Sequence, residues 1–314
     1  MTYFAPTTDT SSAPELPSAS WGQGRRLEFI DFRLRWDKTV NRSDLTTHFG
    51  ISVPQASTDI ARYTQLASDN LFYDRSSRTY RATDSYAPVI GNTAPQRYLN
   101  ELLACEQGLL IEQDSYLGWR PPFAAVPVLS RLVDAGTLSL LLDAIREQGC
   151  VRIKYQSDAE PEPVERVISP HAFGFDGFRW HVRAFCLLRD GYRDFVLGRI
   201  LGISKEVGPG RAPELDSKWL NVISLSIGAS PALSEGNRRA VELDYSMVDG
   251  KAVLEVREAL LYYVLKELGL GPFAATLSGG TQIVLLNEAE LSGYIQDAVS
   301  AKTATRTGTL NHGR

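Results

Sequence analysis

Apolar residues recur at helical spacing in the part of the sequence that begins near residue 21. Leu27, Ile30 and Leu34 share one face of a predicted helix, because an α-helix repeats every 3.6 residues. A second, shorter apolar stretch follows and stops at Gly50, a residue type that commonly ends helices. The pattern therefore predicts two successive helices, the second of which ends in a tight turn.

A third predicted helix begins directly after that turn. Ser52 is a suitable N-cap, and Pro54 fits the first turn, where no backbone N–H is needed. Two β-rich runs around the polar turn at 74–77 then predict a hairpin. This order of elements predicts a winged helix–turn–helix domain over residues 21–83. The buried face of its third helix is expected to contain Val53, Ala56, Ile60, Tyr63 and Ala67.

The next two segments differ in their patterns. Residues 84–148 show mainly helical spacing and predict a helical linker, with one candidate helix over 95–119 and another over 128–149. Residues 149–206 contain short alternating runs separated by Pro, Gly and Asp turns, which predicts a small β-barrel. The predicted fold class is therefore α+β, with several domains.

The rest of the sequence predicts less regular segments and one further domain. Residues 207–237 are rich in Gly, Pro and Ser and are predicted to form a connector. Residues 238–300 predict a C-terminal α/β extension in the order β-hairpin, helix, strand, helix. We expect a disordered leader over 1–20 and a disordered tail over 301–314.

Composition narrows the class of protein. The chain has 314 residues, of which 43% are hydrophobic and 22% charged, as in ordinary globular proteins. It lacks a long apolar run and a signal-peptide pattern, so we expect a cytoplasmic protein without a membrane contact. Cys105, Cys150 and Cys186 are scattered without metal-ligand spacing, which predicts reduced thiols and neither a metal nor a cofactor.

Charge is distributed unevenly along the chain. The net charge is −4, yet residues 21–81 contain ten Lys and Arg against seven Asp and Glu. A basic block in an acidic chain permits a contact with nucleic acid. Hydroxyl and amide side chains near the start of the third helix can reach base edges, and arginines on the hairpin can neutralise phosphates. The predicted DNA-binding residues are Arg25, Arg26, Arg42, Ser52, Gln55, Ser57, Thr58, Arg62, Arg75, Arg78 and Arg81. The alternative is an ordinary solvated helix face, on which Asp59 would also lie.

A second hairpin, over residues 178–199, is also rich in arginine and is called the arginine hairpin below. One predicted face points to the core and contains Phe178, Trp180, Val182, Ala184 and Cys186. The other face of the first strand contains Arg179, His181, Arg183 and Phe185. The return strand is expected to present a common face with Arg193, Phe195, Leu197 and Arg199.

Crowded guanidinium groups repel one another, and a bound polyanion would offset that repulsion. This reasoning predicts a ligand site on the arginine hairpin, to which Ser169 and His171 of a neighbouring strand could contribute. The alternative is that the arginines form ordinary surface salt bridges with acids of the same region, namely Glu165, Asp176, Asp190 and Asp194.

Three sequence motifs in this region resemble the WYL domain of bacterial transcription regulators. They are "ISPH" at 168–171, "RWHVRAFC" at 179–186 and "YRDFVLGRI" at 192–200. The segments before and after resemble the winged helix–turn–helix and the C-terminal dimerisation domain that accompany WYL domains, most closely in regulators of bacterial phage-defence operons. Trp180-His181-Val182 stands where the family has Trp-Tyr-Leu, which reduces the stacking surface at His181.

The resemblance implies a dimeric DNA-binding regulator with an Sm-like barrel that binds a nucleotide or nucleic-acid ligand. By position and proximity, the implied ligand-binding residues are Ser169, His171, His181, Arg183, Arg193 and Arg199. We therefore predict a homodimeric repressor of a phage-defence operon that binds a palindromic double-stranded operator under ligand control.

Two other classes of function remain open from the sequence. One is a module that binds RNA or single-stranded nucleic acid through the barrel, without operator-specific regulation. The other is an enzyme, which the absence of G-x-S-x-G, P-loop and H-E-x-x-H motifs disfavours. A hydrolase that pairs His171 with Asp176 is the remaining enzymatic hypothesis.

Overall fold

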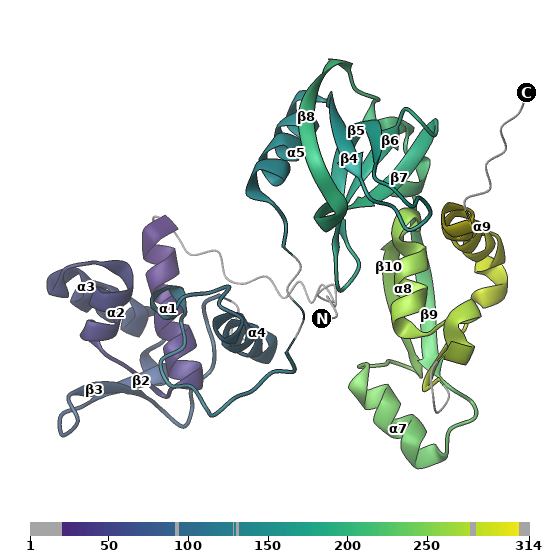
Figure 1. The fold of residues 1–314 in the computed structure, drawn as a ribbon. Coiled ribbons are helices and arrows are strands. Elements are labelled where there is room, and N and C mark those ends of the chain that lie inside the picture. Colours follow the sequence, from purple (N-terminus) through teal and green to yellow (C-terminus); the bar gives the residue numbers. More distant parts are fainter. Residues whose placement is uncertain (1–20, 92–93, 128, 130–131, 277–280, 308–314) are drawn as a thin grey trace, which may run out of the picture. The chain divides into compact units, whose positions relative to one another are not determined.

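Two compact units make up the part of the chain that the computed structural model describes, which is residues 21–91, 94–127, 129, 132–276 and 281–307. The first unit ends at Leu129, and the second contains the described residues from 132 onward (Figure 1). The predicted leader lies outside the described residues. Within the described residues, no helix is long and apolar enough to cross a membrane.

A winged helix–turn–helix forms the first unit, as the sequence predicts. Gly50 has the left-handed φ of 63° that ends the second helix, and the Ser52 hydroxyl accepts a hydrogen bond from Gln55 N over 3.3 Å. The three-stranded sheet has the order β1-β3-β2, so the hairpin pairs with a strand that lies between the first two helices. The elements are α1 (Trp21–Trp36), β1 (Thr39–Val40), α2 (Arg42–Phe49), α3 (Val53–Leu66), β2 (Leu71–Asp74) and β3 (Thr79–Ala82).

The buried face of α3 is shorter than predicted. Ala56, Ile60 and Tyr63 are fully buried, but the Val53 side chain is 58% exposed. Val53 lies in the first turn, whose neighbours Ser52 and Pro54 are exposed as well. The start of α3 is therefore left uncovered by the rest of the unit, as a helix that inserts into a DNA groove requires.

A buried carboxylate, Asp31 of α1, holds the segment after the hairpin in place. It is fully buried and accepts hydrogen bonds from the hydroxyls of Tyr63 and Tyr86 and from the backbone N–H of Val89 and Ile90. Burial and the charge of Asp31 both raise the pKa of the two tyrosines. Both phenols consequently stay neutral and remain donors to Asp31.

The segment predicted as a helical linker divides between two cores. Its first helix, α4 (Pro95–Glu106), ends 13 residues before the predicted end at Trp119. Tyr116 and Leu117 then pack in the core of the first unit without helical structure. The second helix, α5 (Ala135–Glu147), packs against the sheet of the second unit through Leu141. Each apolar face thus joins the nearest core, since neither helix could bury its apolar residues in an isolated linker.

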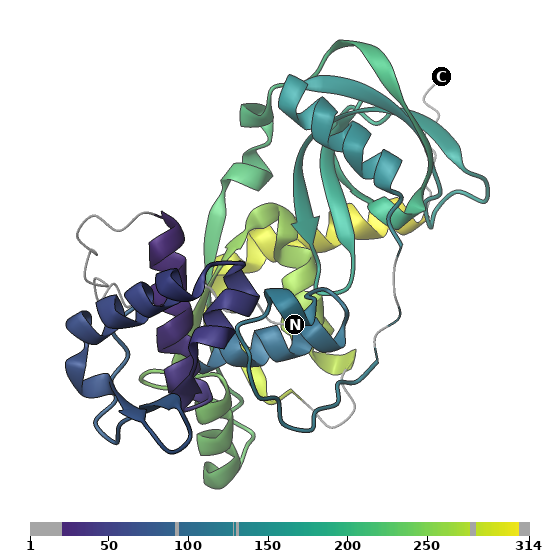
Figure 2. The ribbon, with the colours of Figure 1, turned by 90° about the vertical axis from the view of Figure 1, so that its left-hand side faces the viewer.

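Five antiparallel strands form the sheet of the second unit, in the order β7-β6-β5-β4-β8. Helix α5 lies along this sheet (Figure 2). Among the described residues, the strand pairs leave β7 and β8 as edges, so a curved sheet is observed and the predicted closed barrel is not. The strands are β4 (Gly149–Tyr155), β5 (Val164–Phe175), β6 (Trp180–Cys186), β7 (Gly191–Val196) and β8 (Ile200–Pro209).

The C-terminal region corrects three predictions. The predicted connector contains α6 (Ser217–Leu220) and β9 (Val222–Ala229), the central strand of a second sheet with the order β10-β9-β11. The first arm of the predicted β-hairpin is instead helix α7 (Glu235–Asp244), which Ser234 caps. The predicted tail begins inside α9 (Glu288–Thr307). The other elements are β10 (Lys251–Arg257), α8 (Leu261–Leu268) and β11 (Ile283–Leu285).

Candidate nucleic-acid interface

The first turns of α3 carry the predicted base-reading side chains, and the helix itself engages two of them. The Ser57 hydroxyl donates to Val53 O and the Thr58 hydroxyl donates to Pro54 O, each over 3.0 Å. Such bonds use the hydroxyl hydrogen and orient the group, but they leave its lone pairs able to accept a hydrogen bond. Thr58 and the capping Ser52 are exposed, so they can meet a nucleic acid without rearrangement.

Arg26 and Gln55, both predicted DNA contacts, instead bind a carboxylate of their own unit. Asp59 is fully buried, which corrects its predicted place on the solvated face of α3. Arg26 Nε donates to it over 2.6 Å, and Gln55 Nε2 donates to it over 3.2 Å. This cluster joins α1 to α3. Its members therefore position the recognition helix, and Arg26 is poorly placed to neutralise a phosphate.

Arg42, at the start of α2, links α3 to the wing. Its Nε donates to the Ser57 hydroxyl and its Nη2 to the Tyr80 hydroxyl of β3, both over 2.9 Å. Its guanidinium also lies 5.4 Å from the centre of the Tyr80 ring. Helix α3 and the β2–β3 hairpin, which is called the wing below, are thus fixed relative to each other by one side chain.

The wing tip presents exposed arginines. Arg75 and Arg78 lie in its turn and are exposed. Asp74 shapes this turn by accepting hydrogen bonds from Ser76 and Ser77, which hold the pKa of Asp74 well below its usual range. Arg81 pairs with Asp74 over 3.3 Å, so part of its charge is compensated.

The two other predicted arginines of this unit have different surroundings. Arg25 is exposed at the start of α1, with its guanidinium 5.5 Å from the centre of the Tyr116 ring. Arg62 is half-buried on α3, and its Nη1 donates to Gln65 Oε1 over 3.3 Å. Both remain accessible in part, and within the described residues neither guanidinium forms an ion pair with a carboxylate.

The register of the arginine hairpin differs from the prediction. Arg183 lies opposite Asp194, and Arg193 lies opposite Ala184. Directly paired residues of antiparallel strands share a face, so Arg193 lies on the core side with Ala184 and away from Arg183. The predicted core residues Val182, Ala184 and Cys186 are buried, but Phe178 is 61% exposed and Trp180 52% exposed.

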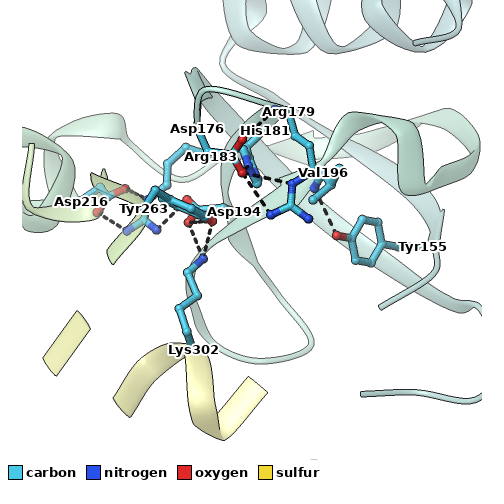
Figure 3. A network of polar contacts seen from close by, with 10 residues as sticks. All are labelled: Tyr155, Asp176, Arg179, His181, Arg183, Asp194, Val196, Asp216, Tyr263 and Lys302. Carbon is cyan, nitrogen blue, oxygen red and sulfur yellow. Dashed lines mark hydrogen bonds and ion pairs between the residues drawn. The ribbon is translucent and has the colours of Figure 1, made fainter. Parts of the chain in front are cut away.

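Arg183 is buried and fully engaged by carboxylates (Figure 3). Its Nε and Nη2 donate to Asp216 over 2.7 and 3.0 Å, and its Nη1 donates to Asp194 over 3.1 Å. His171, which lies at a register shift of β5, contacts Asp216 Oδ2 at 3.0 Å. Burial alone would raise the pKa of Asp216, but the hydrogen bonds from His171 and Arg183 outweigh it and hold that pKa well below its usual range.

His181 and Arg179 belong to a second buried cluster on the same sheet (Figure 3). Asp176 receives His181 Nε2 at 2.8 Å and Arg179 Nε at 3.1 Å, and it also accepts backbone hydrogen bonds from Phe178 and Arg179. Burial alone would raise the pKa of Asp176, but these hydrogen bonds lower it. Asp176 therefore pairs with His181 and not with His171. The hydrolase hypothesis consequently loses its geometric basis.

Side chains of the C-terminal elements complete this polar face. Tyr263 of α8 donates to Asp194 Oδ2 over 2.9 Å, and Lys302 Nζ of α9 donates to the same oxygen over 2.7 Å. Burial would raise the pKa of Asp194, but the charges of Lys302 and Arg183 lower it to about 2. The outer face of the arginine hairpin is thus an internal contact of the second unit.

The six predicted ligand-binding residues do not meet in one open site. Ser169 is buried and accepts a hydrogen bond from Arg211 N over 2.8 Å, while His171, His181 and Arg183 belong to the clusters above. Arg199 lies in a 3-10 turn after β7 and pairs with Asp158 at 2.9 Å. The surface salt-bridge alternative therefore described Arg199 well, although its partner is not one of the predicted acids.

The acids that hold Arg183 were only partly found from the sequence. Asp194 is among the acids predicted as surface partners, and the pairing of β6 and β7 places it opposite Arg183. Asp216 lies 33 residues from Arg183 in the predicted connector, where local periodicity gives no signal for it. The cap motif "DSKWL", in which Asp216 accepts from Trp219 N, was the one available indication.

Comparison with known proteins assigns all three domains. The sequence matches family models for the winged helix–turn–helix domain of the BrxR transcriptional regulator at residues 22–104, the WYL domain at 136–204, and the BrxR C-terminal dimerization domain at 222–291. It is also similar over most of its length to curated proteins described as the DNA-binding transcriptional repressor CapW.

The similarity to these repressors is high. The protein of Escherichia coli strain KTE188 is 48% identical over 253 residues, which are 80% of this chain and 84% of that protein. The Pseudomonas aeruginosa protein is 44% identical over 293 residues, 93% of this chain and 98% of that protein. The Stenotrophomonas maltophilia protein is 44% identical over 272 residues, 86% of this chain and 91% of that protein.

Proposed function

The chain belongs to the family of WYL-domain DNA-binding transcriptional repressors that includes CapW, and we propose that it represses a phage-defence operon as a homodimer bound to a palindromic operator. The observation that carries the proposal is the wing tip, where Arg75 and Arg78 are exposed at the end of a hairpin that Arg42 fixes to the recognition helix. The match to a dimerization domain supports the homodimer. Two copies of α3 would then read two half-sites.

We propose further that a nucleotide or nucleic-acid ligand controls DNA binding through the WYL domain. Arg193 and Arg199 are the candidates for direct contact, since both are only partly buried. Ser169, His171, His181 and Arg183 have the different role of coupling the sheet to the connector and to the C-terminal helices. Their burial and internal partners support that role.

The test is a gel-shift titration on the DNA upstream of the protein's own gene. The variant R62A/R75A/R78A is expected to bind at least about 100-fold more weakly, because removing an arginine from a phosphate or a base costs about 1 kcal/mol or more. R146A/R152A/R239A removes the same charge from surface ion pairs of the second unit and should bind within about threefold of the unaltered protein. Normal binding by the first variant would refute the proposed surface.

A module for single-stranded nucleic acid is the second candidate, favoured by exposed aromatic rings at the end of β5 and at the start of the arginine hairpin. Phe175 and Trp180 lie 5.0 Å apart between ring centres, and both are at least one-third exposed, as is Phe178. Aromatic faces stack on unpaired bases. Comparing the affinity for the duplex with the affinity for each of its strands separates this function from operator binding.

A further inference from the structure

The loop between β4 and β5, residues 156–163, supplies carboxylates to arginines of three different segments. Glu160 Oε1 contacts Arg189 Nη2 at 3.1 Å and lies 4.0 Å from Arg166 Nη2. Asp158 Oδ1 contacts Arg199 Nη2 at 2.9 Å. The loop is called the acidic loop below. It is held by its own turn, in which Gln156 Nε2 donates to Glu160 O and Glu160 N donates to Ser157.

Arg166 is the arginine whose hydrogen-bond donors and charge this arrangement satisfies least. It is only 7% exposed and lies opposite Ile153, a fully buried core residue, so its side chain lies on the core face of β5. Its Nε is buried and, among the described residues, has no hydrogen-bond partner. The carboxylate of Glu160 is at the outer limit of an ion pair with its guanidinium. A buried donor without an acceptor destabilises the fold, so the packing of the sheet does not account for an arginine at this position.

Positive charge accumulates around Arg166. Arg193 lies on the same core face, and its pKa is lowered by burial and by the charges of Arg189 and Arg166. The charge of Glu160 is shared between two guanidiniums, and Asp158 is 58% exposed. The acidic loop therefore neutralises the positive charge of the arginines only in part. Its carboxylates can move into solvent at little cost in free energy.

We propose that the carboxylates of the acidic loop occupy the place of a phosphate group, and that a phosphate-bearing ligand displaces them to bind Arg166, Arg189 and Arg199. Guanidinium forks bind phosphate oxygens in the same bidentate manner as carboxylates, and a phosphate has an additional oxygen for the buried Nε of Arg166. The ligand and the loop compete for the same donors, so the loop sets the ligand affinity. The inference rests on the proposed ligand control and specifies its site and its chemical class.

The test is calorimetric titration of the full chain with two probes, ATP and a 12-residue oligothymidylate. Asp158→Asn and Glu160→Gln together remove the competing charges without changing side-chain size. This double variant is expected to bind one of the probes about tenfold more tightly than the unaltered protein, and adding Arg189→Gln should abolish the gain. The probe that responds distinguishes a nucleotide from a nucleic-acid source of the phosphate.

D143N/E147Q is the matched control, because it removes two negative charges from surface ion pairs of the same unit. Equal affinities of the acidic-loop variant and this control would overturn the competition proposed here. The same preparations are tested for binding to the upstream DNA. If the acidic-loop variant gains no affinity for either probe while operator binding is intact, only this inference is refuted. If the unaltered chain does not bind the operator, the proposed function is refuted.

Discussion

The wing and the arginine hairpin are both basic β-hairpins, yet Arg75 and Arg78 of the first and Arg183 of the second have opposite surroundings. Arg75 and Arg78 of the wing are exposed, beside an aspartate that accepts most of its hydrogen bonds from serines of the turn. Arg183 of the arginine hairpin is 6% exposed and bound by two aspartates. The first arrangement leaves charge available for a polyanion. The second uses charge to join parts of one unit, so the number of arginines on a hairpin does not by itself indicate a ligand site.

Among the changes that test this comparison, removing Asp216 is expected to have the largest effect, a decrease in the free energy of unfolding. Asp216→Ala leaves Arg183 buried with half of its partners and deprives His171 of its acceptor. Breaking a buried ion pair from one side costs about 3 to 5 kcal/mol in the free energy of unfolding. Urea unfolding followed by circular dichroism measures it, with Asp143→Ala on the surface of α5 as the control at about 0.5 kcal/mol or less. A reduction below about 1 kcal/mol for Asp216→Ala would mean that the network is not a structural element.

Acid should weaken the second unit through Asp194. Its pKa is lowered to about 2 in the folded state from the usual 3.8, so its contribution is fully present above pH ~4. That contribution, about 2 kcal/mol, disappears as the pH falls from ~4 toward ~2, because the unfolded chain binds the proton first. Urea unfolding at several pH values between about 5 and 3 detects the onset of this decrease. Lys302→Met should make the dependence markedly shallower, while Lys205→Met, from a surface pair, should not.

The smallest expected effect concerns the salt dependence of operator binding. If Arg75 and Arg78 contact phosphates, R75A/R78A should lower the affinity and reduce the slope of log K against log salt by about 0.9 for each phosphate that is no longer neutralised. R189A/R199A, assayed without added ligand, removes the same charge from the arginine hairpin, where each of these two arginines has a carboxylate partner, and should leave the slope unchanged. Equal slopes for the two variants would remove the distinction between the hairpins.

The sequence by itself determined the elements that depend on local spacing and on motifs. Helical periodicity placed α1 and α3, Ser52 and Gly50 set the boundaries around the turn, and "YRDFVLGRI" led to the WYL family. These features are readable because capping, helical repeat and motif each involve residues within about four to ten positions. Even so, local alternation misled where a cap decided the outcome, as at Ser234 before α7.

Only the tertiary structure decided which charges are available. Asp59 is buried because Arg26, 33 residues away, reaches it from another helix. Arg193 and Arg183 lie on opposite faces because the register of β6 and β7 is set by the turn between them. An ion pair forms between groups that the folded chain brings together, and its free energy depends on their burial and distance rather than on their sequence. The local elements and motifs of this protein could therefore be predicted from its sequence, whereas the roles of its arginines could not.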